Sequence, residues 1–198
     1  MKPKFFLISL AVSSVFFGCA SNQISDFGIR VPGETKIILK NLAVEYNAIG
    51  DGYMGIENYT KAVEYYEKAL RDEDLYLPVY YKLARAYALG KNYDKAVDAY
   101  EHLLSLDKDN LSLKLSLAYV YAVKGDTDTA IAKYKILMDE NPYNEPILEN
   151  YITLLLNVGR AEDAEKYYFI MNEKFPDNSQ LSSFAQKLSD LLDDFNPN

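Results

Sequence analysis

Residues 77–144 consist of two consecutive segments of 34 residues that align without a gap. They read LPVYYKLARAYALGKNYDKAVDAYEHLLSLDKDN (77–110) and LSLKLSLAYVYAVKGDTDTAIAKYKILMDENPYN (111–144). Each has a large and a small apolar residue in succession, then an aromatic residue, a turn, an alanine and a second aromatic residue. These residues are Leu83, Ala84, Tyr87, Ala96 and Tyr100, with counterparts Leu117, Ala118, Tyr121, Ala130 and Tyr134. A period of this length indicates stacked helix pairs.

The pattern resembles the tetratricopeptide repeat (TPR). The resemblance implies an all-α fold, a right-handed superhelical solenoid of about four helix–turn–helix repeats, which is enough to bury a continuous core. The repeats are expected at residues 36–76, 77–110, 111–144 and 145–178. The first has 41 residues, and we expect its 7 extra residues between its two helices, around Gly50–Tyr59. Gly50–Gly55 also satisfies G-x-G-x-x-G, but without the preceding strand of a dinucleotide site we expect a flexible extended turn there.

Residues 179–198 are expected to form a capping helix and tail. Leu181, Phe184, Leu188 and Leu191 recur at helical spacing, with polar residues on the other side. An amphipathic last helix covers the otherwise exposed face of a terminal repeat and keeps such arrays soluble. A dimerisation helix is the alternative role.

The N-terminal residues have the features of an export signal. Lys2 and Lys4 precede an apolar stretch of 13 residues, which is shorter than the roughly 20 residues of a membrane-spanning helix. We therefore expect residues 1–18 to be a signal peptide. Gly18-Cys19 resembles the lipobox of bacterial lipoproteins, which implies acylation of Cys19 and anchoring in a membrane. The alternative is an ordinary cleavage site after Ala20, which would remove the cysteine. Residues 19–35 are expected to be a tether.

Composition excludes several classes of function. The chain has a net charge of −8, and removal of residues 1–18 makes it −10, which argues against binding to nucleic acid or to anionic lipid. One Cys and one His allow neither an internal disulfide nor a Cys/His metal cluster. His102 is expected to be solvated. We find no nucleophile–base pair or phosphate loop, so we predict neither a cofactor nor a metal, and no enzyme.

The resemblance implies a concave face lined by the first helix of each repeat. The repeat register places eight non-core positions there: Lys40, Val44, Tyr81, Arg85, Leu115, Tyr119, Glu149 and Thr153. From these we predict a partner-binding groove of Lys40, Tyr81, Arg85, Tyr119, Glu149 and Thr153, suited to an extended peptide. Arg85 would pair with a carboxylate while Tyr81 and Tyr119 supply contact area. Glu149 would meet a basic residue. The alternative is that these are ordinary solvated helix residues.

These features together predict a scaffold or adaptor lipoprotein that binds other cell-envelope proteins. Ala20 follows Cys19 where an aspartate would favour inner-membrane retention in enterobacterial lipoproteins. This resemblance favours the outer membrane, with the repeats facing the periplasm. A second hypothesis is a lipoprotein that binds a small hydrophobic ligand and works with a transporter. That function requires a deep, closed apolar pocket, which the Gly50–Tyr59 segment would roof.

Overall fold

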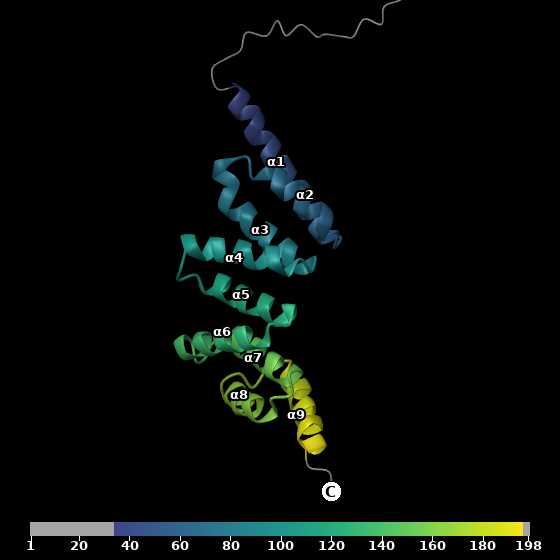
Figure 1. Ribbon diagram of the computed structural model, residues 1–198, viewed down its shortest axis with the longest axis vertical. Helices are drawn as coiled ribbons and strands as arrows, with labels where there is room; N and C mark the ends of the chain where they lie inside the picture. The colour runs from purple at the N-terminus through teal and green to yellow at the C-terminus, as the bar shows by residue number, and fades with distance from the viewer. Residues whose placement is uncertain (1–33, 196–198) are drawn as a thin grey trace, which may run out of the picture. The chain divides into compact units, whose positions relative to one another are not determined.

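The structure is a computed structural model that describes residues 34–195, with side chains from 41 to 192. Within this range the chain forms nine α-helices, one 3-10 helix and no strand (Figure 1). The elements are α1 (Glu34–Gly55), α2 (Tyr59–Ala69), η1 (Glu73–Leu75), α3 (Tyr76–Leu89), α4 (Tyr93–Leu106), α5 (Leu111–Lys124), α6 (Thr127–Glu140), α7 (Glu145–Asn157), α8 (Ala161–Lys174) and α9 (Leu181–Phe195). The predicted signal peptide and Cys19 lie outside the described residues.

The helices form four antiparallel pairs, α1/α2, α3/α4, α5/α6 and α7/α8, followed by α9. Each helix from α2 onward packs against its neighbour in the chain. The predicted all-α solenoid of helix pairs with a C-terminal helix is therefore confirmed. No helix in the described part of the chain combines the length and the apolar character needed to span a membrane.

Asparagine and aspartate side chains define where several helices begin. Asn58, Asn110, Asp126 and Asn144 each accept a hydrogen bond from the backbone N–H three residues later. Such a cap satisfies one of the free donors at a helix N-terminus. The tight turns between paired helices have a left-handed residue at the same place in every repeat, namely Glu57, Lys91, Gly125 and Gly159.

These four turn positions correct the prediction for the first repeat. Each lies 34 residues after the one before, so no residues are inserted between α1 and α2. Residues 50–55 are not an extended turn but the last part of α1, which has 22 residues where α3 has 14. The seven extra residues extend the N-terminal end of α1. Because seven residues make almost two helical turns, this shift leaves the apolar stripe on the same helix face.

Gly50 explains why a glycine-rich stretch is helical here. A Cβ atom at Gly50 would lie 2.6 Å from ring carbons of Tyr66, which is buried between α1 and α2. In the next two repeats the corresponding positions hold Ala84 and Ala118, both buried. The lack of a side chain at Gly50 therefore lets a tyrosine of α2 pack directly on the backbone of α1.

Helix α9 keeps the 34-residue register but replaces apolar residues by polar ones. On α7 the face toward α8 consists of residues that are completely buried, Leu148, Ile152 and Leu155. The corresponding positions on α9 are exposed and polar: Ser182, Gln186 and Ser189. Leu181, Phe184 and Leu188 of α9 are buried against the preceding repeat. The helix thus packs on the fourth repeat as the first helix of a fifth repeat would, while its opposite face is polar and ends the array as a cap.

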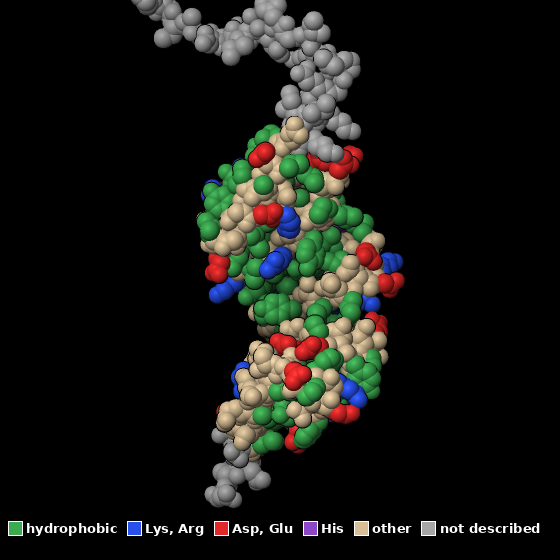
Figure 2. Space-filling view, turned by 180° about the vertical axis from the view of Figure 1, so that it is seen from behind, with side chains coloured by type: hydrophobic (Ala, Val, Ile, Leu, Met, Phe, Trp, Pro, Cys, Tyr) green, Lys and Arg blue, Asp and Glu red, His purple; other side chains and the backbone are tan. Residues whose placement is uncertain are grey.

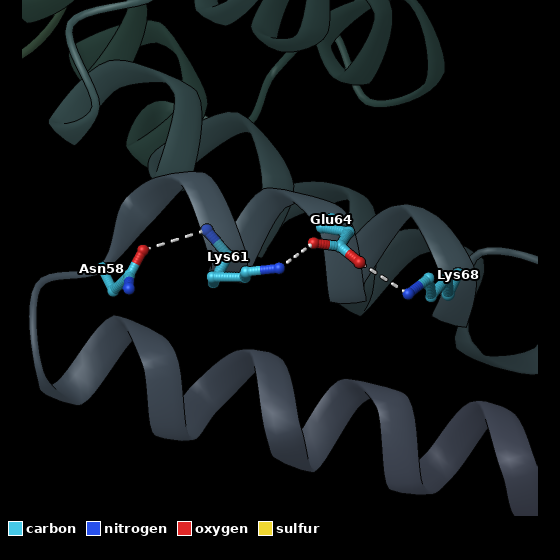
Figure 3. A network of polar contacts seen from close by, with 4 residues as sticks. All are labelled: Asn58, Lys61, Glu64 and Lys68. Carbon is cyan, nitrogen blue, oxygen red and sulfur yellow. Dashed lines mark hydrogen bonds and ion pairs between the residues drawn. The ribbon is translucent and has the colours of Figure 1, made fainter.

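A polar network covers the exposed face of α2 near the N-terminal end of the array (Figure 3). Glu64 accepts hydrogen bonds from Lys61 at 2.7 Å and from Lys68 at 2.8 Å. These two ammonium groups lower the pKa of Glu64 from 4.5 to about 2. The Lys68 ammonium also lies 4.6 Å from the centre of the Tyr65 ring, in a cation–π contact.

Candidate protein-binding groove

Two of the predicted groove residues lie one turn apart on α3. Tyr81 and Arg85 are four residues apart and therefore project from the same face of the helix. Tyr81 is 39% exposed, and Arg85 is exposed as well. Tyr119 occupies the place of Arg85 in the next repeat, on α5, and is 46% exposed. The predicted exposure of these three side chains is therefore present in the folded chain.

A layer of buried tyrosines lies beneath them, one from each of the first three second helices. These are Tyr66, Tyr100 and Tyr134 on α2, α4 and α6. The Tyr81 ring meets the Tyr100 ring edge to face, with centroids 6.3 Å apart and planes at 77°. The pKa of Tyr100 is raised to about 12, mainly by burial and also by the neighbouring Tyr81, while the hydrogen bond with Ser116 and the charge of Arg85 oppose the rise. Through Tyr100, the layer beneath the predicted groove residues thus links α3, α4 and α5.

The positive charge of Arg85 acts on two of these buried tyrosines. Burial raises the pKa of Tyr66, its hydrogen bond to Asp51 adds to this rise, and Arg85 lowers it. Arg85 has the same lowering effect on the pKa of Tyr100. Within residues 41–192, Arg85 makes no hydrogen bond and no ion pair. Its five N–H donors are therefore available to a ligand.

The neighbouring Lys82 is different because it already has a counter-ion. Its ammonium donates to Asp51 Oδ2 at 2.7 Å and to Asn47 Oδ1 at 3.0 Å. The other carboxylate oxygen of Asp51, Oδ1, accepts a hydrogen bond from the Tyr66 hydroxyl at 2.7 Å. This network joins α1, α2 and α3. Of the two cations on α3, Arg85 is thus the one without an ion pair in the part of the chain whose side chains are described.

The same network corrects the predicted groove residues of the first repeat. The 34-residue register equates Tyr81 and Arg85 with Asn47 and Asp51, and not with Lys40 and Val44. Val44 is exposed about two turns earlier on α1, and the side chain of Lys40 lies outside the described residues. Sequence analysis overlooked a signal that reveals this register: ENYTKAV (57–63) matches KNYDKAV (91–97) without a gap.

The two predicted residues of the fourth repeat lie together on α7. Asn178 donates its amide to Glu149 at 3.4 Å and to Glu145 at 2.8 Å, which orients both carboxylates. The Thr153 hydroxyl donates to the backbone oxygen of Glu149 at 2.8 Å. Because Thr153 uses its hydroxyl proton within its own helix, it is a weaker ligand donor than predicted. Of the two predicted groove residues on α7, Glu149 is therefore the stronger candidate for a polar contact with a partner.

Comparisons with known proteins agree with this architecture. Two family models described as tetratricopeptide repeat match the sequence, one at residues 35–109 and one at residues 92–145. The chain contains tetratricopeptide repeats. A search of curated protein sequences gave no significant match. The TPR assignment therefore rests on the repeat models and on solved structures.

Three of the similar solved structures are TPR proteins. One, from Parabacteroides merdae ATCC 43184, has a TM-score of 0.64 and 18% identity, and the match covers 79% of this chain and 62% of that one. A thermophilic TPR protein from Thermus thermophilus has a TM-score of 0.60 and 21% identity, with 73% and 80% covered. YrrB, described as a TPR protein with an unusual peptide-binding site, has a TM-score of 0.54 and 20% identity, with 83% and 92% covered. At these identities the likeness concerns the fold.

His102 on α4 of the TPR array is not the solvated residue that the sequence suggested. Its Nε2 atom lies 2.9 Å from the Tyr76 hydroxyl, and its ring meets the Tyr80 ring at 5.0 Å between centroids. The residue is half-buried between α3 and α4. The prediction failed because helix periodicity alone placed His102 off the apolar stripe and did not show the tyrosines of α3.

Among the described residues, the structure lacks the roof that was predicted for a hydrophobic-ligand pocket. The segment expected to roof it is helical from Gly50 to Gly55 and so forms no flexible cover over a groove. A cavity of about 350 Å³ lies at the turn between α7 and α8, lined by Gly159, Arg160, Ala161, Glu162, Asp163 and Leu192. Four of these six residues are charged or glycine, and none of the six is a predicted groove residue. Within the described residues no group of three or more His, Cys, Asp or Glu side chains is placed to hold a metal ion.

Proposed function

We propose that this protein is a membrane-anchored TPR scaffold that binds segments of other cell-envelope proteins in the groove formed by α1, α3, α5 and α7. The observation that carries the proposal is the exposed set Tyr81, Arg85 and Tyr119 above a buried tyrosine layer. Large aromatic residues and arginine provide most of the binding energy at protein interfaces. A rigid row of helices holds these side chains in place before a partner arrives, which reduces the entropy lost on binding.

Peptide binding is known for a protein with this fold, since YrrB is described as having a peptide-binding site. The fold itself favours a role in protein–protein interaction, and the groove chemistry favours binding over catalysis. In the proposed mechanism, acyl chains on Cys19 hold the protein at the outer membrane with the repeats in the periplasm. The groove then brings a partner segment to a membrane-bound complex. The anchoring step is supported by Gly18-Cys19 and the preceding apolar stretch.

Photocrosslinking in the native cell tests the binding step. A photoreactive amino acid at Tyr119 of the full-length protein should give a discrete crosslinked envelope protein, identified by mass spectrometry. The same probe at Leu106, which is exposed at the end of α4, is the matched control. We expect the crosslink at 119 only, and its loss when Arg85→Glu is added. Equal crosslinking from both positions, or none from position 119, contradicts groove binding.

Fatty-acid labelling tests the anchoring step separately. Cells grown with an alkyne fatty acid should label the wild-type protein, and the label should disappear in Cys19→Ser. The wild-type protein should fractionate with outer membranes, whereas Cys19→Ser should not. A protein that loses Cys19 by cleavage after Ala20, as judged by intact mass, would refute anchoring but leave the groove unaffected.

A further inference from the structure

The charged groups of the groove follow an order along the array. In the first repeat, Asp51 is neutralised by Lys82 at 2.7 Å. In the second, Arg85 has no ion pair with any residue from 41 to 192. In the third, the two groove positions are uncharged, Leu115 and Tyr119. In the fourth, Glu149 meets the amide of Asn178 and, within the same residues, no cationic side chain. The groove positions available to a ligand thus carry a positive charge in the second repeat, no charge in the third and a negative charge in the fourth.

The face seen in Figure 2 also has this mixed character. Basic side chains lie among hydrophobic ones over its upper repeats, and acidic side chains lie over both the upper and the lower repeats. The chain as a whole is acidic, with a net charge of −8. The unpaired positive charge of Arg85 beside the tyrosines is therefore an exception to the prevailing negative charge. A ligand that covers Arg85 and the exposed tyrosines around it would shield the ion pair from water and so strengthen it.

We infer that the ligand is an extended segment with an acidic residue, an apolar or aromatic middle and a basic residue. The carboxylate of the acidic residue pairs with the guanidinium of Arg85, which suits it as a bidentate partner. The middle lies on Leu115 and Tyr119. The basic residue meets Glu149. A segment with the same charge at both ends places like charges together at one of them, which is costly at an interface.

The acidic group belongs to the interior of the segment and not to a chain terminus. Groove positions extend on both sides of Arg85, with Asn47 and Asp51 on α1 and Tyr119 on α5. A ligand that ended at Arg85 would leave one of these sides empty. This inference rests on the proposed function, because it assumes that the groove binds a protein segment.

Fluorescence anisotropy with the full-length protein in detergent micelles provides the test. Four synthetic peptides share one aromatic middle: acidic–basic, basic–acidic, acidic–acidic and basic–basic. One of the two mixed peptides should bind tightest, because the groove fixes the direction of the main chain. Both peptides with like charges should bind about tenfold more weakly or worse. Amidation of the C-terminus should leave the tightest affinity unchanged; a large loss would show terminal carboxylate binding and overturn the interior assignment.

Charge reversal in the protein makes the test independent of peptide direction. Arg85→Glu should make the basic–basic peptide the tightest ligand, and Glu149→Lys should do the same for the acidic–acidic peptide. Arg71→Glu, exposed between α2 and η1, is the matched control and should keep the wild-type ranking. Circular dichroism verifies that each variant is folded.

The outcomes separate this inference from the proposed function. An unchanged peptide ranking in folded Arg85→Glu and Glu149→Lys overturns the charge order, while a crosslink at position 119 would still support the scaffold. The absence of both peptide binding and a crosslink overturns both proposals.

Discussion

Tyr87 and Tyr121 occupy the same position in the second and third repeats, and each donates its hydroxyl to a glutamate of the preceding repeat. The partners are Glu67 at 2.7 Å and Glu101 at 3.1 Å. In the fourth repeat the same position holds Leu155, which is 0% exposed. The N-terminal repeats thus meet through tyrosine–glutamate hydrogen bonds at the place where the C-terminal repeat has a closed aliphatic core.

A second position shows the same difference. Val79, Leu113 and Ile147 are buried at the start of the first helices, but the first repeat has Glu45, which is exposed. The repeat pattern therefore fixes where helices meet but not what fills the contact. In an array whose repeats touch only their neighbours, such differences make stability uneven along the chain. We expect the C-terminal repeats and α9 to be the most stable part of the described array.

The largest effect should come from opening the aliphatic core. Leu155→Ala removes a completely buried side chain and should lower the free energy of unfolding by about 2–5 kcal/mol. Its counterpart Tyr87→Phe removes one partly exposed hydrogen bond and should cost about 1 kcal/mol or less. Denaturant unfolding measures both. Equal losses would mean that the two ends do not differ in the way we describe.

The close contact at the N-terminal end should produce the next largest effect. Gly50→Ala places a Cβ atom within 2.6 Å of the Tyr66 ring and should destabilise the protein by about 1–3 kcal/mol. Gly52→Ala on the same helix meets no atom within 4 Å and should stabilise it by about 0.5–1 kcal/mol. If Gly50→Ala lowers the free energy of unfolding and Gly52→Ala raises it, the close contact between Gly50 and the Tyr66 ring is established. A stable Gly50→Ala protein would show that α2 packs differently.

The turns should show a smaller difference between the two regions. Lys91 adopts a left-handed backbone with φ of 61°, where the third and fourth repeats have Gly125 and Gly159. Lys91→Gly should therefore stabilise the protein by about 1 kcal/mol, because the strain removed exceeds the added flexibility of the unfolded chain. The reverse change, Gly125→Lys, should destabilise it by a similar amount. Thermal unfolding of the two variants tests this symmetry.

The smallest effect concerns Glu64 on the surface of α2, and it depends on pH. The pKa of Glu64 is lowered in the folded protein, so its ion pairs with Lys61 and Lys68 stabilise fully above the ordinary value of 4.5. This contribution is lost as the pH falls toward about 2. The difference in melting temperature between wild type and Glu64→Gln should shrink over that interval. A constant difference would show that the charge of Glu64 has no role.

Much of this architecture was predictable because the repeat is a local pattern. Small residues at Ala84 and Ala118, with aromatic residues after them, are sufficient to indicate helix pairs and their order. The length of α1 was not predictable from the apolar stripe, because a shift of seven residues preserves the stripe. The exposure of Tyr81, Arg85 and Tyr119 was predictable, because the repeats align there without a gap. The partners of His102 and Lys82 were not, since they come from helices whose facing positions no short motif encodes.

The polar face of α9 limits how an array of this kind can grow in evolution. A helix pair duplicated and added after α9 would have to lay its small residues on Gln186, which donates to Asp190 at 2.8 Å, and on two exposed serines. Such an addition needs several substitutions before it gains any buried surface. A copy of residues 77–110 inserted before residue 111 would meet neighbours that already fit both of its sides. Lengthening by internal duplication therefore requires fewer changes than lengthening at the C-terminal end.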